Sequence, residues 1–181
     1  MSEQTDLLKE VVKKLEEVDI RYMISGSIAS SYFAQPRMTR DIDIVVELSL
    51  LNAESLIQSF SNEYYIDELA VRDAISRTSQ FNVIHLATMI KIDFIVRKDT
   101  SYRATEFQRR QRVTIDNESI WFVTPEDLIL SKLIWAFDSR SEIQLNDVRT
   151  MIDDVETLDW SYIEYWANQL ELVEMLNEVR L

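Results

Sequence analysis

The sequence contains no cysteine, and among its 181 residues it has one glycine, two prolines and one histidine. The absence of cysteine excludes disulfides, thiolate nucleophiles, cysteine-based zinc sites and iron–sulfur clusters. A single histidine cannot build both a catalytic triad and a metal site. Chemistry in this chain therefore has to rest on carboxylates, hydroxyls and basic side chains.

Long apolar runs are also missing, since none approaches the roughly 18 residues of a membrane span, and the N-terminus lacks the basic and apolar stretch of a signal peptide. We therefore expect a cytoplasmic protein without a membrane segment. Basic charge is scarce too, because 19 Lys and Arg face 32 Asp and Glu, for a formal net charge of -13. This balance argues against binding a long DNA duplex, whose affinity depends on neutralising phosphates.

The hydrophobic residues, 46% of the chain, are enough for one sizeable core, and their spacing predicts a mixed α/β order. The predicted helices are 6–18, 28–34, 51–60, 67–76, 128–137, 145–152 and 160–179. The predicted strands are 22–24, 42–46, 81–86, 90–96, 113–115 and 120–123, with 81–86 and 90–96 forming a hairpin. We expect an α/β core over residues 1–123 and a helical extension over 124–181 that closes a cleft.

Three carboxylates occupy positions in apolar strands where a fold gains nothing from them. Asp41 and Asp43 are two residues apart, so their side chains leave the same face of a strand. Asp93 lies inside the apolar run 92–96. Two carboxylates about 4 Å apart repel each other by roughly 4 kcal/mol at an effective dielectric of 20. A cluster of three needs cations, and oxygen ligands suit Mg²⁺ or Mn²⁺.

Gly26 is the only glycine, and it stands with Ser27 between a predicted strand and a predicted helix. Glycine lets the backbone approach a ligand closely, and the free N–H groups at a helix start favour phosphate. A chain that avoids glycine in every other turn keeps this one because the position has no substitute. The segment predicts a phosphate-binding turn.

Together these residues resemble the nucleotidyltransferase superfamily typified by DNA polymerase β. Its pattern is a Gly-Gly or Gly-Ser turn, a helix, two acids separated by one apolar residue, and a third strand carboxylate; here these are Gly26–Ser27, Asp41, Asp43 and Asp93. The similarity extends to minimal bacterial members that include toxins of type IV toxin–antitoxin pairs. The segments that carry this further similarity are 37–40, 81–85 and 125–132, with Asp147 downstream.

The resemblance implies a nucleotidyltransferase fold, a mixed and mainly antiparallel sheet flanked by helices, and Mg²⁺-dependent transfer of a nucleoside monophosphate from a triphosphate such as ATP. Asp41, Asp43 and Asp93 would hold two Mg²⁺ ions, with Mn²⁺ as a substitute. Gly26 and Ser27 would bind the β- and γ-phosphates. Lys132 and Arg40 would neutralise the triphosphate. The acceptor stays open between an RNA end, a protein hydroxyl and a small molecule.

Alternative interpretations remain for several of these features. An EF-hand is excluded because its central glycine and twelfth-position glutamate are absent, and a dehalogenase-type phosphatase is disfavoured because polar residues precede the acids. His85 is either structural or catalytic, Lys132 is either a solvated lysine or a ligand, and the cluster Arg109, Arg110 and Arg112 either balances neighbouring acids or contacts a polyanion. The rival function is a silent protein that binds a nucleotide or a toxin or antitoxin partner.

Overall fold

The computed structural model describes residues 3–36 and 39–180 of the chain. The helices are α1 (Glu3–Glu17), α2 (Gly26–Phe33), α3 (Ala53–Phe60), α4 (Glu68–Arg77), α5 (Ser101–Arg109), α6 (Pro125–Ser139), α7 (Glu142–Asp154), α8 (Trp160–Gln169) and α9 (Val173–Val179). The strands are β1 (Tyr22–Ile24), β2 (Ile42–Val46), β3 (Tyr64–Ile66), β4 (Gln80–His85), β5 (Lys91–Val96), β6 (Gln111–Ile115) and β7 (Glu118–Phe122).

The mixed α/β order predicted from the sequence is confirmed, with three differences. Strand β3 was not predicted, because its three residues are too few to show an alternating pattern. Helix α5 was not predicted either, because its buried face includes Glu106 beside Tyr102 and Phe107 and so lacks an apolar repeat. The predicted helix 160–179 is divided into α8 and α9, since Leu170 ends α8 and the backbone at Glu171 is left-handed.

The seven strands form one sheet in the order β3-β4-β5-β2-β1-β7-β6. Four of its six strand pairs are antiparallel, while β2 pairs with β5 and β1 with β7 in parallel. The prediction of a mixed, mainly antiparallel sheet is therefore confirmed. The parallel pair β2–β5 lies near the centre of the sheet, and it carries Asp43 and Asp93 of the predicted site, with Asp41 directly before β2.

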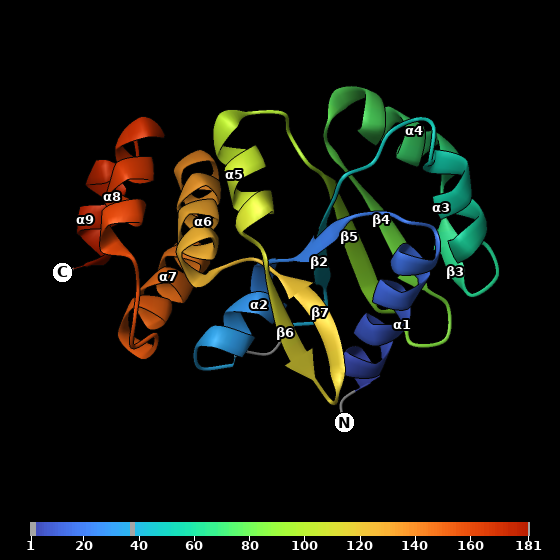
Figure 1. Cartoon of the computed structure of the whole chain (residues 1–181), viewed down its shortest axis with the longest axis horizontal. Coiled ribbons are helices and arrows are strands. Elements are labelled where there is room, and N and C mark those ends of the chain that lie inside the picture. Colours follow the sequence, from blue (N-terminus) through green and yellow to red (C-terminus); the bar gives the residue numbers. More distant parts are fainter. Residues whose placement is uncertain (1–2, 37–38, 181) are drawn as a thin grey trace.

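The central strands bury one face almost completely and leave the other less covered. On β2, Ile42, Ile44 and Val46 are fully buried, whereas Asp43 and Val45 between them are half-buried. Helix α6 contacts α2, α7, α8 and α9. In Figure 1 the C-terminal helices α6 to α9 gather at the end of the molecule away from α3 and α4, with the sheet between the two groups. Residues of β2, β5 and α6 line a cleft.

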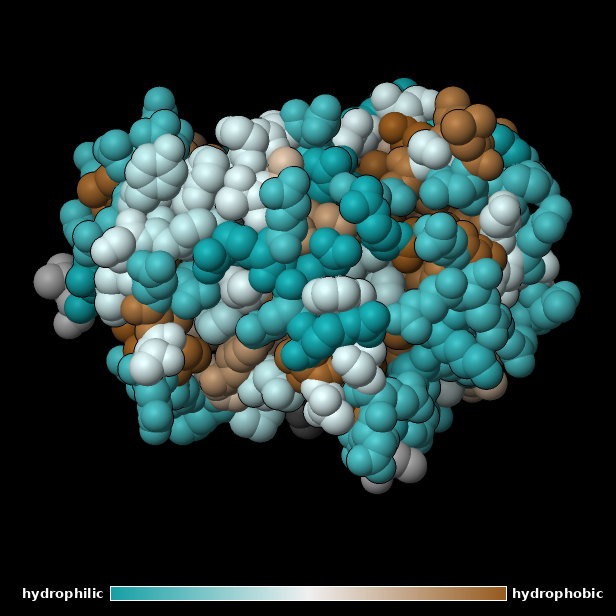
Figure 2. Space-filling view, in the orientation of Figure 1, coloured by the Kyte–Doolittle hydropathy of each residue, from teal (hydrophilic) through white to brown (hydrophobic). Residues whose placement is uncertain are grey.

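The visible surface is largely hydrophilic, and its apolar residues form small separate areas (Figure 2). This distribution matches the formal net charge of -13. Within residues 3–36 and 39–180, no helix combines the length and the apolar character that crossing a membrane requires.

Candidate active site

Asp43 and Asp93 are direct neighbours in the sheet. The parallel register of β2 and β5 places Asp43 opposite Asp93, and adjacent strands lie about 4.8 Å apart. Asp41 precedes β2 and, by the alternation of side chains, belongs to the same face as Asp43. The structure thus brings together two acids that are 50 positions apart in the sequence.

The electrostatic environment of Asp43 disfavours its charged form. Burial raises the pKa of the Asp43 carboxyl above its ordinary value of 3.8, and the negative charge of Asp93 raises that pKa further. The backbone N–H of Ser27 donates a hydrogen bond to this carboxylate, and together with the charge of Lys132 it lowers the same pKa. The two strand acids therefore repel each other within a partly desolvated site, which favours a bound cation.

Gly26 begins α2 directly against the Asp43 side chain. Its backbone is left-handed, with a φ of +61°, and a Cβ atom added there would lie 1.9 Å from Asp43 Oδ2 and 2.7 Å from Asp43 Cβ. Both the backbone conformation and the space exclude any larger residue. The only glycine of the chain is thus where the start of α2 approaches the acid pair, which the sequence predicted as a point of close approach to a ligand.

Lys91 contacts both Asp41 and Asp93, which are not opposite each other in the strand register. Its Nζ lies 2.8 Å from Asp93 Oδ2 and 3.4 Å from Asp41 Oδ2. The hydrogen bond that Lys91 donates to Asp93 raises the pKa of its amine. The other oxygen of Asp93, Oδ1, is buried without a hydrogen-bond partner. No role for Lys91 was predicted from the sequence, because only the pairing of β2 with β5 brings its amine to Asp41.

The predicted metal-binding trio is therefore not assembled around a common point. Within the described residues, no group of three or more His, Cys, Asp or Glu side chains is arranged so that it could hold a metal ion as it stands. The amine of Lys91 lies between Asp41 and Asp93 in this arrangement. The metal-binding role of the three acids stays a prediction.

Lys132 on α6 is buried, with 3% of its surface exposed, so the alternative of a solvated lysine is wrong. Its Nζ donates to Asp147 Oδ2 at 2.6 Å and to Gln144 Oε1 at 3.1 Å, both on α7. The positive charge of Lys132 also lowers the pKa of Asp43 on the other side of the cleft. The ion pair with Asp147 therefore positions a cation opposite the acid pair.

A cleft separates α6 from the half-buried face of β2 and β5. It consists of two adjoining cavities of about 140 and 180 Å³. The residues that line both cavities are Ser25, Ile95, Ser131 and Trp135. Gly26, Ser27, Asp43 and Lys132 line the first of them. Four of the seven residues predicted to form the site therefore line one cavity.

The other predicted residues lie beside this cavity or away from it. Asp41 and Asp93 do not line it, although Asp93 is the sheet neighbour of Asp43. Arg40 is exposed before β2 and is not part of the lining either. Arg37 and Met38, which belong to a segment quoted for the family resemblance, lie outside the described residues.

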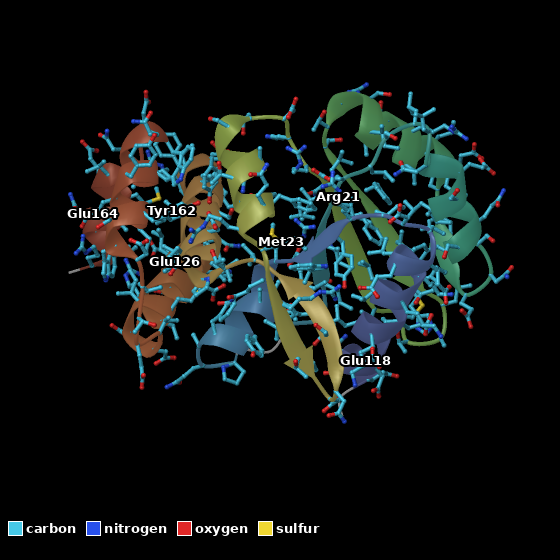
Figure 3. All side chains as sticks on the ribbon, viewed as in Figure 1. Arg21, Met23, Glu118, Glu126, Tyr162 and Glu164 are labelled. Carbon is cyan, nitrogen blue, oxygen red and sulfur yellow. The ribbon has the colours of Figure 1, made fainter. Side chains whose placement is uncertain are left out.

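The arginine cluster is held by contacts within the chain. Arg109 Nε donates to Asp127 Oδ2 at 3.0 Å, and its guanidinium lies 3.8 Å from the ring centroid of Tyr162. Tyr162 donates its hydroxyl to Asp127 Oδ1 at 2.6 Å, and Figure 3 shows Tyr162 in the helical end of the molecule together with Glu126. Asp127 is fully buried. These contacts join α5, α6 and α8.

The next two arginines of the cluster pack on aromatic rings. The guanidinium of Arg110 lies 4.4 Å from the Phe107 ring and 4.7 Å from the Trp121 ring. Arg112 lies 4.4 Å from the Trp121 ring and pairs with Glu16 at 3.5 Å. These contacts favour the structural interpretation of the cluster.

His85 also has a structural environment. Its Nδ1 lies 2.9 Å from Thr88 Oγ1, and its ring centroid lies 5.0 Å from that of Tyr64. It does not line the cleft between β2, β5 and α6. These contacts stabilise the turn between β4 and β5.

Comparisons with known proteins support the fold. No protein-family model and no curated protein sequence matches the chain. ANT(2'')-Ia, solved in complex with adenylyl-2''-tobramycin, superposes with a TM-score of 0.59 at 13% identity, over 99% of both chains. The antigenic nucleotidyltransferase-like protein of Paracoccidioides brasiliensis has a TM-score of 0.56 at 14% identity, over 96% of this chain and 90% of the other.

A third neighbour is the lincosamide antibiotic adenylyltransferase LnuA, solved with lincomycin bound. Its TM-score is 0.53 at 13% identity, over 83% of this chain and 96% of the other. The chain therefore has the nucleotidyltransferase fold, as the sequence resemblance implied. At these identities the likeness establishes the fold alone.

Proposed function

We propose that this protein is a metal-dependent nucleotidyltransferase that moves a nucleoside monophosphate from a nucleoside triphosphate, such as ATP, to an acceptor hydroxyl. The observation that carries the proposal is the pairing of Asp43 with Asp93 on neighbouring strands, directly against the glycine that begins α2. Two mutually repelling carboxylates beside a helix start and a buried lysine have no evident structural use. They suit a site for cations and phosphates.

The donor set fits Mg²⁺ or Mn²⁺. Asp43 and Asp93 are oxygen ligands on adjacent strands, and the buried Oδ1 of Asp93 has no hydrogen-bond partner. Asp41 adds a third carboxylate once its contact with Lys91 opens. When bound, such ions neutralise phosphate charge and lower the pKa of an attacking hydroxyl. We propose two ions, as the family resemblance implies.

The residues of the chain would then bind and orient the triphosphate. Gly26 lets the start of α2 lie directly against Asp43, whose carboxylate accepts from the Ser27 N–H, and this positive end of α2 would face the β- and γ-phosphates of the bound triphosphate. Lys132, held by Asp147 and Gln144, offers positive charge from the opposite wall, and Arg40, which is exposed before β2, would add charge from outside the cleft. In the transfer, the acceptor oxygen bonds to the α-phosphorus, the bond to the bridging oxygen breaks, the hydroxyl proton is released and pyrophosphate leaves.

The acceptor we propose is a small hydroxyl-bearing molecule rather than an RNA end or a protein. Two structural neighbours were solved with an antibiotic or with its adenylylated product. The net charge of -13 disfavours a polyanion, and the arginines that were candidates to contact one are engaged within the chain. We also propose that the protein is cytoplasmic and that it has a toxin–antitoxin partner protein, as the family resemblance implies.

The test is incubation of the purified protein with each of four α-labelled nucleoside triphosphates and Mg²⁺, with a panel of hydroxylated small molecules and with cell extract as the source of acceptor. We expect label transfer and pyrophosphate release that disappear in Asp43→Asn and without divalent ions. The matched control is Asp116→Asn, at a carboxylate in the turn between β6 and β7 that pairs with Lys9. Nucleotide binding without transfer, unaffected by Asp43→Asn, would instead support the silent binding protein.

A further inference from the structure

Lys91 provides a positive charge within the acid cluster itself. Its Nζ contacts Asp93 Oδ2 at 2.8 Å and Asp41 Oδ2 at 3.4 Å, so it bridges two of the three proposed metal ligands. The side chain of Asp93 is only 12% exposed, while that of Lys91 is 37% exposed. The amine therefore sits at the mouth of the cluster, with solvent on one side and a nearly buried carboxylate on the other.

The position of Lys91 follows from the register of β2 and β5. Ile92 pairs with Ile42 and Asp93 with Asp43, so Lys91 comes level with Asp41 on the neighbouring strand. Alternation along β5 puts Lys91 and Asp93 on the same face. A lysine two residues before the third acid is thus held over both flanking carboxylates by the backbone.

We propose that Lys91 is a built-in counter-cation that competes with the divalent ion for the oxygens of Asp41 and Asp93. In the metal-free protein it screens the repulsion among the acids and keeps them in place. When a divalent ion enters, the amine leaves these oxygens, which its flexible four-carbon stem and partial exposure allow. This inference rests on the proposed function, because it takes the three acids as metal ligands.

Competition of this kind has a measurable consequence for metal affinity. A divalent ion arriving alone must displace Lys91 and give up the attraction between the amine and two carboxylates. An ion that arrives with a triphosphate brings anionic oxygens that offset this loss. The protein is therefore expected to take up metal weakly by itself and more tightly with nucleotide.

The experiment measures Mn²⁺ binding to the full chain by the loss of the free-ion EPR signal, without nucleotide. Lys91→Met removes the amine and keeps a side chain of similar length. Lys13→Met is the matched control, because it changes the net charge equally at a lysine whose side chain is 76% exposed. Lys91→Arg retains the charge, and Asp93→Asn, alone and combined with Lys91→Met, identifies the site.

We expect Lys91→Met to bind Mn²⁺ at least about tenfold more tightly than the wild type, which corresponds to about 1.4 kcal/mol. Lys13→Met and Lys91→Arg should stay within about twofold of the wild type, and Asp93→Asn should abolish the gain. Unfolding of metal-free Lys91→Met at a lower urea concentration than the wild type, reversed by Mn²⁺, would add support and would also show that the variant folds.

Two other outcomes can be told apart. Equal or weaker Mn²⁺ binding in folded Lys91→Met, with binding still lost in Asp93→Asn, would overturn the counter-cation and leave the metal site intact. If no variant bound Mn²⁺ in a manner sensitive to Asp93→Asn, with or without triphosphate, the metal site of the proposed function would fail, and this inference with it.

Discussion

Replacing Gly26 by alanine tests how closely the start of α2 approaches the acid pair. The added Cβ would lie 1.9 Å from Asp43 Oδ2, 2.4 Å from Cγ and 2.7 Å from Cβ. Rotating the Asp43 side chain relieves the first two contacts only by breaking its hydrogen bond with the Ser27 N–H, and the third contact involves an atom fixed by the backbone of β2. The left-handed backbone adds about 1–2 kcal/mol for a residue with a Cβ. Overpacking adds about 1–3 kcal/mol.

We therefore expect Gly26→Ala to lower the free energy of unfolding by about 3 kcal/mol and to abolish triphosphate binding. Urea unfolding of a double-mutant cycle separates the two causes. In an Asp43→Ala background the contacts with Oδ2 and Cγ are absent, so only the backbone strain and the contact with Cβ remain. The destabilisation by Gly26→Ala should then be smaller by about 1–2 kcal/mol, which is within the range measured for residues in contact.

Additive effects of the two substitutions would contradict this prediction. If Gly26→Ala destabilises the wild type and Asp43→Ala backgrounds equally, to within about 0.5 kcal/mol, the carboxylate of Asp43 is not in contact with residue 26. A Gly26→Ala protein as stable as the wild type would also contradict the left-handed conformation at this position. Binding of triphosphate is measured separately, because a stable variant could still lose the phosphate site.

Two further predictions concern the half-buried Asp43 and the fully buried Asp127. Burial raises the folded-state pKa of Asp43 above 3.8, so the charged carboxylate destabilises the metal-free protein. Asp43→Asn should therefore be more stable than the wild type at neutral pH, and this difference should shrink as the pH falls through the raised pKa toward 3.8. Urea unfolding midpoints of both proteins, measured from about pH 3 to 7, check this sign. A constant difference, or one of the opposite sign, would contradict it. Tyr162→Phe removes the hydrogen bond to buried Asp127 and should lower the free energy of unfolding by about 1.5–3 kcal/mol, whereas Tyr165→Phe, at a ring that is 58% exposed, should change it little. Equal effects of these two substitutions in urea unfolding would argue against a stabilising role of the Tyr162–Asp127 bond.

Much of the fold could be predicted from local patterns. Strand 42–46 was predicted with its observed bounds, because strict alternation with apolar residues is typical of a half-buried strand. Thr124 and Pro125 marked the start of α6, where the threonine hydroxyl accepts from the N–H of Asp127. Helix α5 could not be predicted in this way, because its buried Glu106 is paired with Arg103 and accepts a hydrogen bond from the Ser131 hydroxyl on α6, which no apolar repeat reveals.

The candidate site was predictable only in part. The spacing of Asp41 and Asp43 puts both on one strand face, and the scarcity of glycine drew attention to Gly26. Lys91 had no role predicted from the sequence, and Lys132 was assigned to the triphosphate only through the family resemblance. Lys132 is followed on its helix by apolar residues and looks like any helical lysine until α7 brings Asp147 to within 2.6 Å of its amine.

The sequence by itself therefore determined which residue types are available for chemistry and which strand face each acid occupies, because alternation and turn preferences act within a few residues. Only the tertiary structure decided that β2 and β5 lie side by side in parallel, so that Asp43 meets Asp93 and Lys91 reaches Asp41. The pairing of β2 with β5 joins segments some 50 residues apart through hydrogen bonds between backbone groups. Because these bonds do not depend on particular side chains, no local sequence pattern indicates which strands pair.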